Sequence, residues 1–158
     1  VILVFGNTGR PGTPSFAAAT ELQVGHAPTW GPAVHDLNND KILDLVSPSV
    51  LDHDVAILLG AGNGMFAPAL FLVGIGKGPL DVDVADFDGD GQVDLVVAES
   101  QTDDAAVHYL GNALRGRAFP VGKGPASLCA VDLDGNGKPD VVTANGGSHD
   151  LTVLLNAM

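Results

Sequence analysis

The stretch that decides the fold is DFDGDGQVDLVVA, residues 86–98. Side-chain oxygens stand at positions 1, 3, 5 and 9 of this stretch, and glycines stand at positions 4 and 6. Because glycine takes positive φ without a Cβ clash, such a chain can wrap round a hard cation. The Val-rich run that follows directly has the composition of a β-strand. The sequence therefore predicts a cation-binding loop that leads into a strand.

The same pattern occurs twice more along the chain. One segment, VHDLNNDKILDLVSPS, begins at Val34, and another, AVDLDGNGKPDVVTANG, begins at Ala130. The leading aspartates, Asp36, Asp86 and Asp132, are 50 and 46 residues apart, and repeats of this period indicate a propeller or another repeat array. We expect one module with units at 24–72, 73–120 and 121–158. Residues 1–23, which open with VILVFGNTG, are expected to be the tail of an earlier unit.

Each unit is predicted to hold four short antiparallel strands. The first leads into the acidic loop, the second follows it, the third is of the VAILL type, and a weaker fourth reads ALFLVG or FAAATELQV. These runs are bounded by Gly, Asp, Asn and Pro, as strands are. No window has a convincing helical period; residues 17–19 come nearest, but Pro14 and the β-rich context weaken that alternative. The expected fold class is all-β, with three propeller blades and a partial one.

The three acidic loops predict up to three Ca²⁺ sites per chain. Calcium fits the oxygen-rich pattern better than magnesium, which prefers rigid octahedra, or zinc, which prefers Cys and His. A backbone carbonyl at position 7 would add a ligand to the side chains at positions 1, 3, 5 and 9. The predicted ligands are Asp36, Asn38, Asp40, Ile42 and Asp44; Asp86, Asp88, Asp90, Gln92 and Asp94; and Asp132, Asp134, Asn136, Lys138 and Asp140.

Two alternatives to this site were weighed. An EF-hand needs a Glu at position 12, where this chain has Ser47, Val97 and Thr143. A turn held by Asx hydrogen bonds, with no ion, would leave clustered carboxylates that repel by roughly 1 to 3 kcal/mol per pair. Recurrence in register favours the metal. In the first loop Asn39 and Lys41 replace both glycines, which predicts strain of about 1 kcal/mol at Lys41 and a weaker site.

Charge and composition exclude several classes of protein. Seven Lys and Arg stand against nineteen Asp and Glu, and the net charge of −12 argues against nucleic-acid binding. Three bound Ca²⁺ would reduce that charge to −6. The 46% apolar content supports a folded core, and the apolar runs are too short for a membrane span. The single cysteine, Cys129, forbids an intrachain disulfide and is predicted to be a small core residue.

The segments DFDGDGQVDLVVA, DLDGNGKPDVVTAN and LLGAGNGMFAPALF, with the VGKGP turns, resemble FG-GAP/VCBS repeats. These are the blades of integrin-α-like propellers and of many bacterial surface and secreted proteins. The resemblance implies that the loop between the first two strands holds Ca²⁺ on one face of the propeller and that ligands meet the other face. Because calcium sites of this type fill reliably where calcium is near millimolar, we expect an extracellular, periplasmic or cell-surface location.

The number of units predicts a partner. Propellers close with about four to eight blades, and three units cannot close well alone. The last unit ends at LTVLLNAM without a fourth strand, which FAAATELQV of a second copy could supply. We therefore expect a homodimer that closes a six-bladed ring. The rival expectation is that the chain is a piece of a longer propeller, for which the missing initiator Met is evidence.

Function is predicted to be binding or assembly rather than catalysis. The five histidines show no HxH or HExxH spacing and suit turns or the surface, and no GxSxG elbow or phosphate loop is present. Trp30, His26, His53 and His149 are the candidates for contacting a carbohydrate or protein ligand on the face away from the metals. Two alternatives stay open: the propeller domain of a polysaccharide lyase or hydrolase, and a self-assembling fibre subunit.

Overall fold

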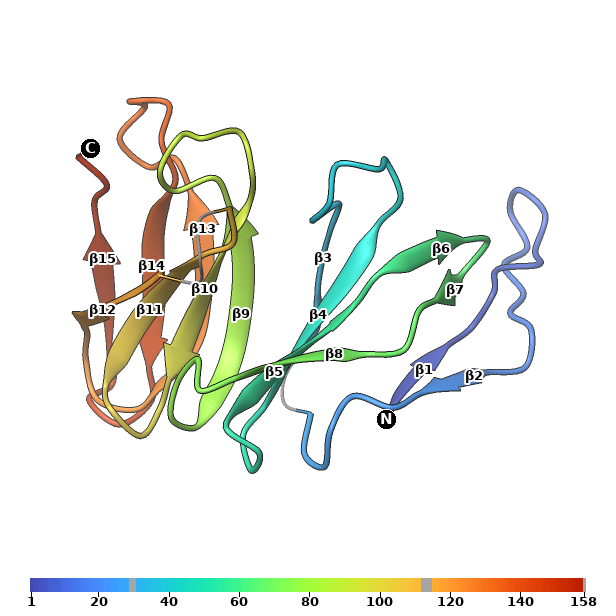
Figure 1. Cartoon of the computed structure of the whole chain (residues 1–158), viewed down its shortest axis with the longest axis horizontal. Coiled ribbons are helices and arrows are strands. Elements are labelled where there is room, and N and C mark those ends of the chain that lie inside the picture. The colour runs from blue at the N-terminus through green and yellow to red at the C-terminus, as the bar shows by residue number, and fades with distance from the viewer. Residues whose placement is uncertain (29–30, 112–114, 158) are drawn as a thin grey trace.

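The computed structural model describes residues 1–28, 31–111 and 115–157, and these residues form only strands and turns (Figure 1). The predicted all-β class is confirmed, and residues 17–19 form no helix. Within the described ranges there is no helix long and apolar enough to cross a membrane. The strands are β1 (Ile2–Val4), β2 (Thr20–Leu22), β3 (Ala33–His35), β4 (Asp44–Ser49), β5 (Asp54–Leu58), β6 (Gly60–Gly62), β7 (Met65–Phe66), β8 (Leu70–Val73), β9 (Pro79–Ala85), β10 (Asp94–Glu99), β11 (Asp104–Tyr109), β12 (Arg115–Pro120), β13 (Pro125–Val131), β14 (Asp140–Asn145) and β15 (Asp150–Leu154).

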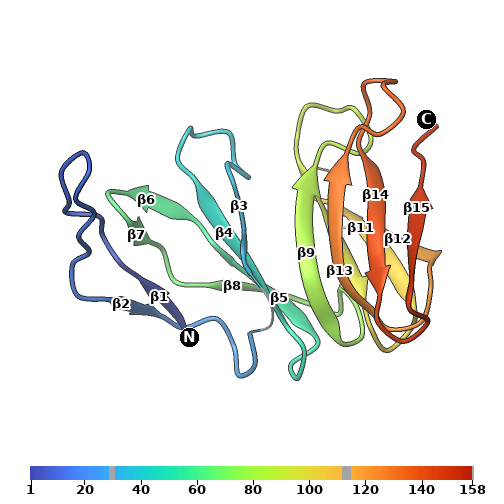
Figure 2. The ribbon, with the colours of Figure 1, turned by 180° about the vertical axis from the view of Figure 1, so that it is seen from behind.

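Three antiparallel sheets follow one another along the chain. Sheet 1 has the order β3-β4-β5-β8, sheet 2 has β9-β10-β11-β12, and sheet 3 has β13-β14-β15. Two small hairpins, β1-β2 and β6-β7, complete the described strands. The sheets lie side by side in chain order (Figures 1 and 2), and none of the described sheets closes on itself. The structure thus contains several small antiparallel sheets, while their arrangement as blades of a propeller stays a prediction.

The core lies between successive sheets, and β10 is its centre. Leu95 and Val97 pack in a buried cluster with Val46 and Val55 of sheet 1. Because strand side chains alternate, Val96 and its neighbours point the other way and pack against sheet 3. Full burial of each such side chain stabilises by about 1.5 to 3 kcal/mol. Burial on both faces explains why this strand is a continuous apolar run.

The β1-β2 hairpin covers part of the other side of sheet 1. β1 pairs with β2 in the register Ile2↔Leu22, and these two side chains pack against buried Leu45 and Leu58. That residues 1–23 are the tail of an earlier unit stays a prediction.

The first strands of sheets 2 and 3 are joined by side chains. Asp83 of β9 accepts the backbone N–H of Val84 on its own strand at 2.9 Å and that of Ala130 on β13 at 2.8 Å. Asp81 bridges Val82 and Leu128 in the same way, at 3.0 and 2.9 Å. Each carboxylate therefore satisfies edge N–H groups of two neighbouring sheets, which protects edges that would otherwise be open.

The prediction that Cys129 is a core residue is wrong, because its side chain is exposed. Its neighbours Leu128 and Ala130 pack toward sheet 2. Alternation turns Cys129 to the opposite face of β13, and no described sheet covers that face.

Candidate metal centre

The three acidic loops occupy the same end of their sheets. Loop 1 (36–44), loop 2 (86–94) and loop 3 (132–140) each connect the first strand of a sheet to the second, and Figures 1 and 2 show all three at one edge of the molecule. The turns between the second and third strands lie at the opposite end. The candidate metal sites therefore share one face, as the resemblance implied.

The first aspartate shapes each loop. In loop 2, Asp86 accepts the backbone N–H groups of Gly89 at 2.7 Å, Asp90 at 3.1 Å and Gly91 at 2.9 Å. Gly89 and Gly91 have φ of 78° and 87°, a region that glycine enters without cost from a Cβ. The chain therefore turns tightly around this carboxylate.

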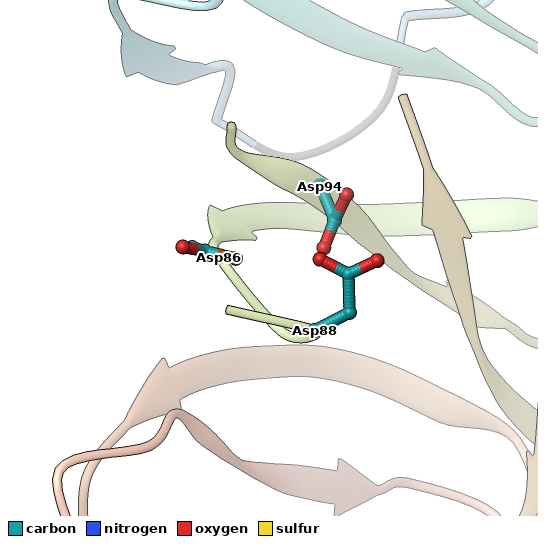
Figure 3. A group of neighbouring side chains, drawn as sticks. All are labelled: Asp86, Asp88 and Asp94. Carbon is teal, nitrogen blue, oxygen red and sulfur yellow. The ribbon is translucent and has the colours of Figure 1, made fainter. Parts of the chain in front are cut away.

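The aspartates at positions 1, 3 and 9 converge in loops 2 and 3. Asp86, Asp88 and Asp94 each offer a carboxylate oxygen, and these oxygens lie within 4.8 Å of one another. Figure 3 shows the carboxylates of Asp88 and Asp94 turned toward each other, with Asp86 at the start of the loop. The equivalent group in loop 3 is Asp132, Asp134 and Asp140. Each group consists of oxygen donors alone, the donor type that hard cations prefer.

The aspartate at position 9 also has a structural role that sequence reasoning missed. Asp94 is buried and accepts the N–H of Phe87 at 3.0 Å and that of Leu110 at 3.2 Å. The same pair of bonds recurs at the other two loops: Asp44 accepts from Leu37 and Gly60, and Asp140 accepts from Leu133 and Asn156. This aspartate therefore ties the start of its loop to the end of the third strand.

The two converging groups differ electrostatically. Burial, followed by repulsion from Asp88 and Asp90, raises the pKa of Asp94 above its ordinary value. The pKa of Asp140 is instead lowered, chiefly by the backbone N–H groups of Asn156 and Leu133. A cation among the carboxylates of loop 2 would offset the burial and the repulsion together.

Loop 1 has the same backbone conformation as the other two loops, although it lacks their glycines. Asn39 and Lys41 have φ of 61° and 70°, so the expected positive φ at Lys41 is confirmed. Lys41 donates its N–H to Asp36 at 2.7 Å, the bond that Gly91 makes in loop 2. The Asn38 amide donates to Asp40 at 2.9 Å, so two of the predicted ligands are bonded to each other.

The predicted ligands at positions 5 and 7 form a turn of their own. The side-chain oxygen at position 5 accepts the N–H at position 7: Asp40 from Ile42 at 2.7 Å, Asp90 from Gln92 at 2.8 Å, and Asn136 from Lys138 at 2.8 Å. In loop 2, where position 5 is an aspartate, the converging group contains Asp86, Asp88 and Asp94 and leaves out Asp90.

The candidate ligand-contacting residues at the opposite end have separate hydrogen bonds. Trp30 lies outside the described residues. The His26 N–H and ring Nδ1 both contact Asp52, at 2.7 and 2.9 Å. The Nδ1 of His53 accepts the N–H of Gly78 at 3.0 Å, and His149 is exposed. The described His26 and His53 thus have different hydrogen-bond partners, and the ligand-binding role of these residues stays a prediction.

The histidine on β11 differs from the expected turn or surface role. His108 is buried, with its Nε2 at 3.9 Å from the Glu99 carboxylate. Burial is the largest single influence on the pKa of Glu99 and raises it. Hydrogen bonds and the charge of His108 together outweigh burial, so the pKa is lowered. Gly116 makes room for this ring, since a Cβ there would lie 2.8 Å from its Nδ1.

A cleft of about 380 Å³ between sheets 2 and 3 was also missed by sequence reasoning. Its lining is mostly apolar and includes Tyr109, Phe119 and Arg117, whose guanidinium lies 4.8 Å from the centre of the Phe119 ring. The lining residues come from both sheets, and no local motif marks them.

Comparisons with known proteins cover the segments just described. A profile of the FG-GAP-like repeat matches residues 36–97, and a profile of the FG-GAP repeat matches residues 124–153. The first match contains loops 1 and 2, and the second contains loop 3. No curated protein matches the chain.

One similar solved structure is that of the V. cholerae biofilm matrix protein Bap1. The alignment has a TM-score of 0.46 and 20% sequence identity, and it covers 92% of this chain. The chain spans 21% of the length of that protein. From the two repeat profiles and the recurring acidic loops that they contain, the chain belongs to the FG-GAP repeat family.

Proposed function

We propose that this chain is a calcium-binding, extracellular FG-GAP module for adhesion or matrix assembly, built from propeller blades. The observation that carries the proposal is the convergence of three carboxylates in loop 2 and again in loop 3, at the same end of adjacent sheets. Membership of the FG-GAP repeat family supports the same reading.

Calcium is the cation that this donor set fits. Both groups lack His and Cys, which zinc prefers, and they consist of carboxylates alone, the donors that calcium takes in oxygen-rich loops. Asp86, Asp88 and Asp94 would hold the ion in loop 2, and Asp132, Asp134 and Asp140 would hold it in loop 3. Loop 1 is proposed as a weaker site, because Asn39 and Lys41 hold positive φ where the other two loops have glycine.

The proposed role of the ion is to connect the strands within each sheet. Asp94 already links its loop to the end of β11 through Leu110, so an ion held by Asp94, Asp86 and Asp88 would connect the loop to three strands of one sheet. A ligand that binds only the folded chain stabilises it by about 2.7 kcal/mol at a concentration one hundred times its Kd. Such sites fill where calcium is near millimolar, which supports an extracellular, periplasmic or cell-surface location.

The proposed ligand of the module is a carbohydrate or a protein. A binding role is supported by membership of the FG-GAP repeat family. Binding on a glycan array without release of products supports the module; calcium-dependent depolymerisation of a glycan would favour the enzymatic alternative.

Calorimetric titration with CaCl₂ tests the metal proposal. The wild type should bind at least two ions, and Asp88→Asn or Asp134→Asn should each remove one binding event. Asp103→Asn is the matched control, because Asp103 lies in a turn at the opposite end and should leave the calcium isotherm unchanged. An isotherm without heat in the wild type, or one that both loop variants leave unchanged, contradicts the proposal.

A further inference from the structure

The turns opposite the acidic loops share an unusual backbone conformation. The residue just before the third strand has positive φ in every sheet: 55° at His53, 61° at Asp103 and 60° at His149. Non-glycine residues seldom adopt this region, although Asn, Asp and His do so more readily than others. The shared turn, which Asp103 and His149 close by donating their N–H groups to Glu99 at 3.1 Å and Asn145 at 2.9 Å, places the three side chains at equivalent positions.

In two of the three turns the side chain of this residue accepts a hydrogen bond from the next sheet. The His53 Nδ1 accepts the N–H of Gly78 at 3.0 Å, and the Asp103 carboxylate accepts the N–H of Gly124 at 2.8 Å. Each glycine directly precedes the proline that begins the first strand of the following sheet. We call His53, Asp103 and His149 the latch residues. Two of them connect sheet 1 to sheet 2 and sheet 2 to sheet 3.

The third latch residue lies at the edge of an uncovered apolar face. His149 is exposed, and its side chain has no hydrogen bond within the described chain. On the face of sheet 3 turned away from sheet 2, Leu151 is 69% exposed and Val131 is 43% exposed. Sheet 2 turns the equivalent face toward sheet 3 and buries Val96 and Val107 there. The outer face of sheet 3 is therefore equivalent to the face of sheet 2 that is buried against sheet 3.

We propose that this outer face docks the first sheet of a second copy of the chain, with the His149 imidazole accepting the backbone N–H of Ala27. Ala27 occupies the position of Gly78 and Gly124. It precedes Pro28, which bridges to Ser49 at the end of β4. In the same way, the prolines after Gly78 and Gly124 pair with the last residues of β10 and β14.

The receiving face of sheet 1 has apolar surface for this contact. Val34 is 51% exposed beside buried Leu45, its partner across the strand pair. The outer part of this face is covered by the β1-β2 hairpin, so docking places β15 beside β2, in the position of β1. Both are third strands, VILV and LTVL, and exchange of equivalent elements between copies is a low-cost route to an oligomer.

A histidine in the latch makes docking dependent on pH. Neutral imidazole can accept a hydrogen bond, whereas the protonated ring has two donors and no acceptor. The titratable groups around the contact are Asp150 beside His149, Lys123, whose carbonyl accepts the N–H groups of the His149 turn, and His26 and Asp52 on the receiving copy. Asp103 accepts the equivalent N–H, that of Gly124, with a carboxylate. An aspartate in place of His149 should therefore accept the N–H of Ala27 without needing a neutral imidazole ring.

Sedimentation velocity over a range of protein concentrations, with calcium present, tests the proposal. At pH 7.5 the wild type should associate, and at pH 5.5 association should weaken, because a protonated imidazole ring has no acceptor for the N–H of Ala27. His149→Ala should weaken association about 3- to 10-fold at pH 7.5, the effect of one hydrogen bond. His149→Asp should restore it. His53→Ala is the matched control and should lower the melting temperature without changing association at pH 7.5.

Hydrogen exchange identifies the surface that associates. On association the β15 amides should gain protection, and the β1 amides should lose it. A wild type that stays monomeric at all concentrations overturns the proposal. So does a His149→Ala variant that associates like the wild type, a folded His149→Asp variant that associates no better than His149→Ala, or association without protection of β15.

Discussion

The Asp94 carboxylate accepts the backbone N–H of Leu110 at 3.2 Å across sixteen residues of sequence. Its other oxygen accepts the N–H of Phe87 at 3.0 Å. One buried side chain thus joins the acidic loop to the end of the third strand, and the equivalent aspartates do so in sheets 1 and 3. The loop is therefore anchored by the protein itself, and the carboxylates beside this anchor are available for a cation.

This double role predicts different effects for two neighbouring aspartates. Asp94→Ala should lower the free energy of unfolding by about 2 kcal/mol even in EDTA, because the buried N–H of Phe87 and the half-buried N–H of Leu110 lose their acceptor. Asp88→Ala should cost less than about 1 kcal/mol in EDTA and should act mainly on the calcium-dependent part of stability. Urea unfolding with and without calcium measures both. Equal losses in EDTA would contradict the structural role of Asp94.

The strained residue in loop 1 predicts a stabilising substitution. Lys41→Gly removes about 1 to 2 kcal/mol of positive-φ strain, while glycine adds about 0.5 to 1 kcal/mol of chain entropy to the unfolded state. The net gain should be about 0.5 kcal/mol. Gly91→Lys in loop 2 is the matched reverse change and should destabilise. Denaturant midpoints that move in the same direction for both variants would refute this account.

The carboxylates between sheets 2 and 3 predict a contribution to stability without any metal. Asp83→Ala leaves the edge N–H groups of Val84 and Ala130 without their acceptor and should cost about 1 to 2 kcal/mol. Ser127→Ala removes only a hydroxyl bond to Asp81 and should cost about 0.5 kcal/mol. Chemical unfolding in EDTA compares the two, and a neutral Asp83→Ala variant would show that water replaces the bridge.

The turn of sheet 1 predicts a pH dependence in acid. The His26 N–H, the Ser49 hydroxyl and the His26 ring lower the pKa of Asp52 to about 2. Because the folded state holds this proton less tightly than the unfolded state, the stabilisation is complete above about pH 4 and is lost as pH falls toward 2. Asp52→Asn should reduce the loss of melting temperature over this range.

The pKa of a second carboxylate beside this turn, that of Asp54, is shifted in the opposite direction, so Asp54 serves as the control. Burial, followed by repulsion from Asp52, raises the pKa of Asp54, and its Oδ1 is buried without a hydrogen bond among the described residues. Its folded form binds the proton more tightly, so ionisation of Asp54 opposes folding as pH rises. Asp54→Asn should therefore not destabilise at pH 7. Identical acid profiles for the two variants would contradict these assignments.

The acidic loops could be predicted from sequence because their chemistry is local. Asp86, Gly89 and Gly91 lie within a few residues of one another, and the fold of the loop depends on little else. The bond from Asp94 to Leu110 could not be foreseen, because its donor is a backbone group that any residue supplies. The bridges of Asp83 depend on a strand of the next sheet and likewise leave no local signal.

The sequence indicated strands but not which of their faces are covered. The Val-rich run of β10 correctly indicated a strand, and the structure shows that both of its faces are buried. Cys129 has an equally apolar context but faces away from sheet 2, so its exposure depends on a surface that the local sequence does not describe. The positive φ at His53 and His149 escaped notice for a related reason, since histidine is compatible with many conformations and only the neighbouring sheet gives this one a partner.

We propose above all that the converging aspartates of loops 2 and 3 bind calcium and thereby stabilise the sheet to which each loop belongs. Thermal unfolding in 2 mM CaCl₂ against 2 mM EDTA tests it most directly. The account predicts a higher melting temperature in calcium, a smaller difference in the Asp88→Asn variant, and a further decrease when Asp134→Asn is added. Equal melting temperatures of the wild type in the two buffers would contradict it.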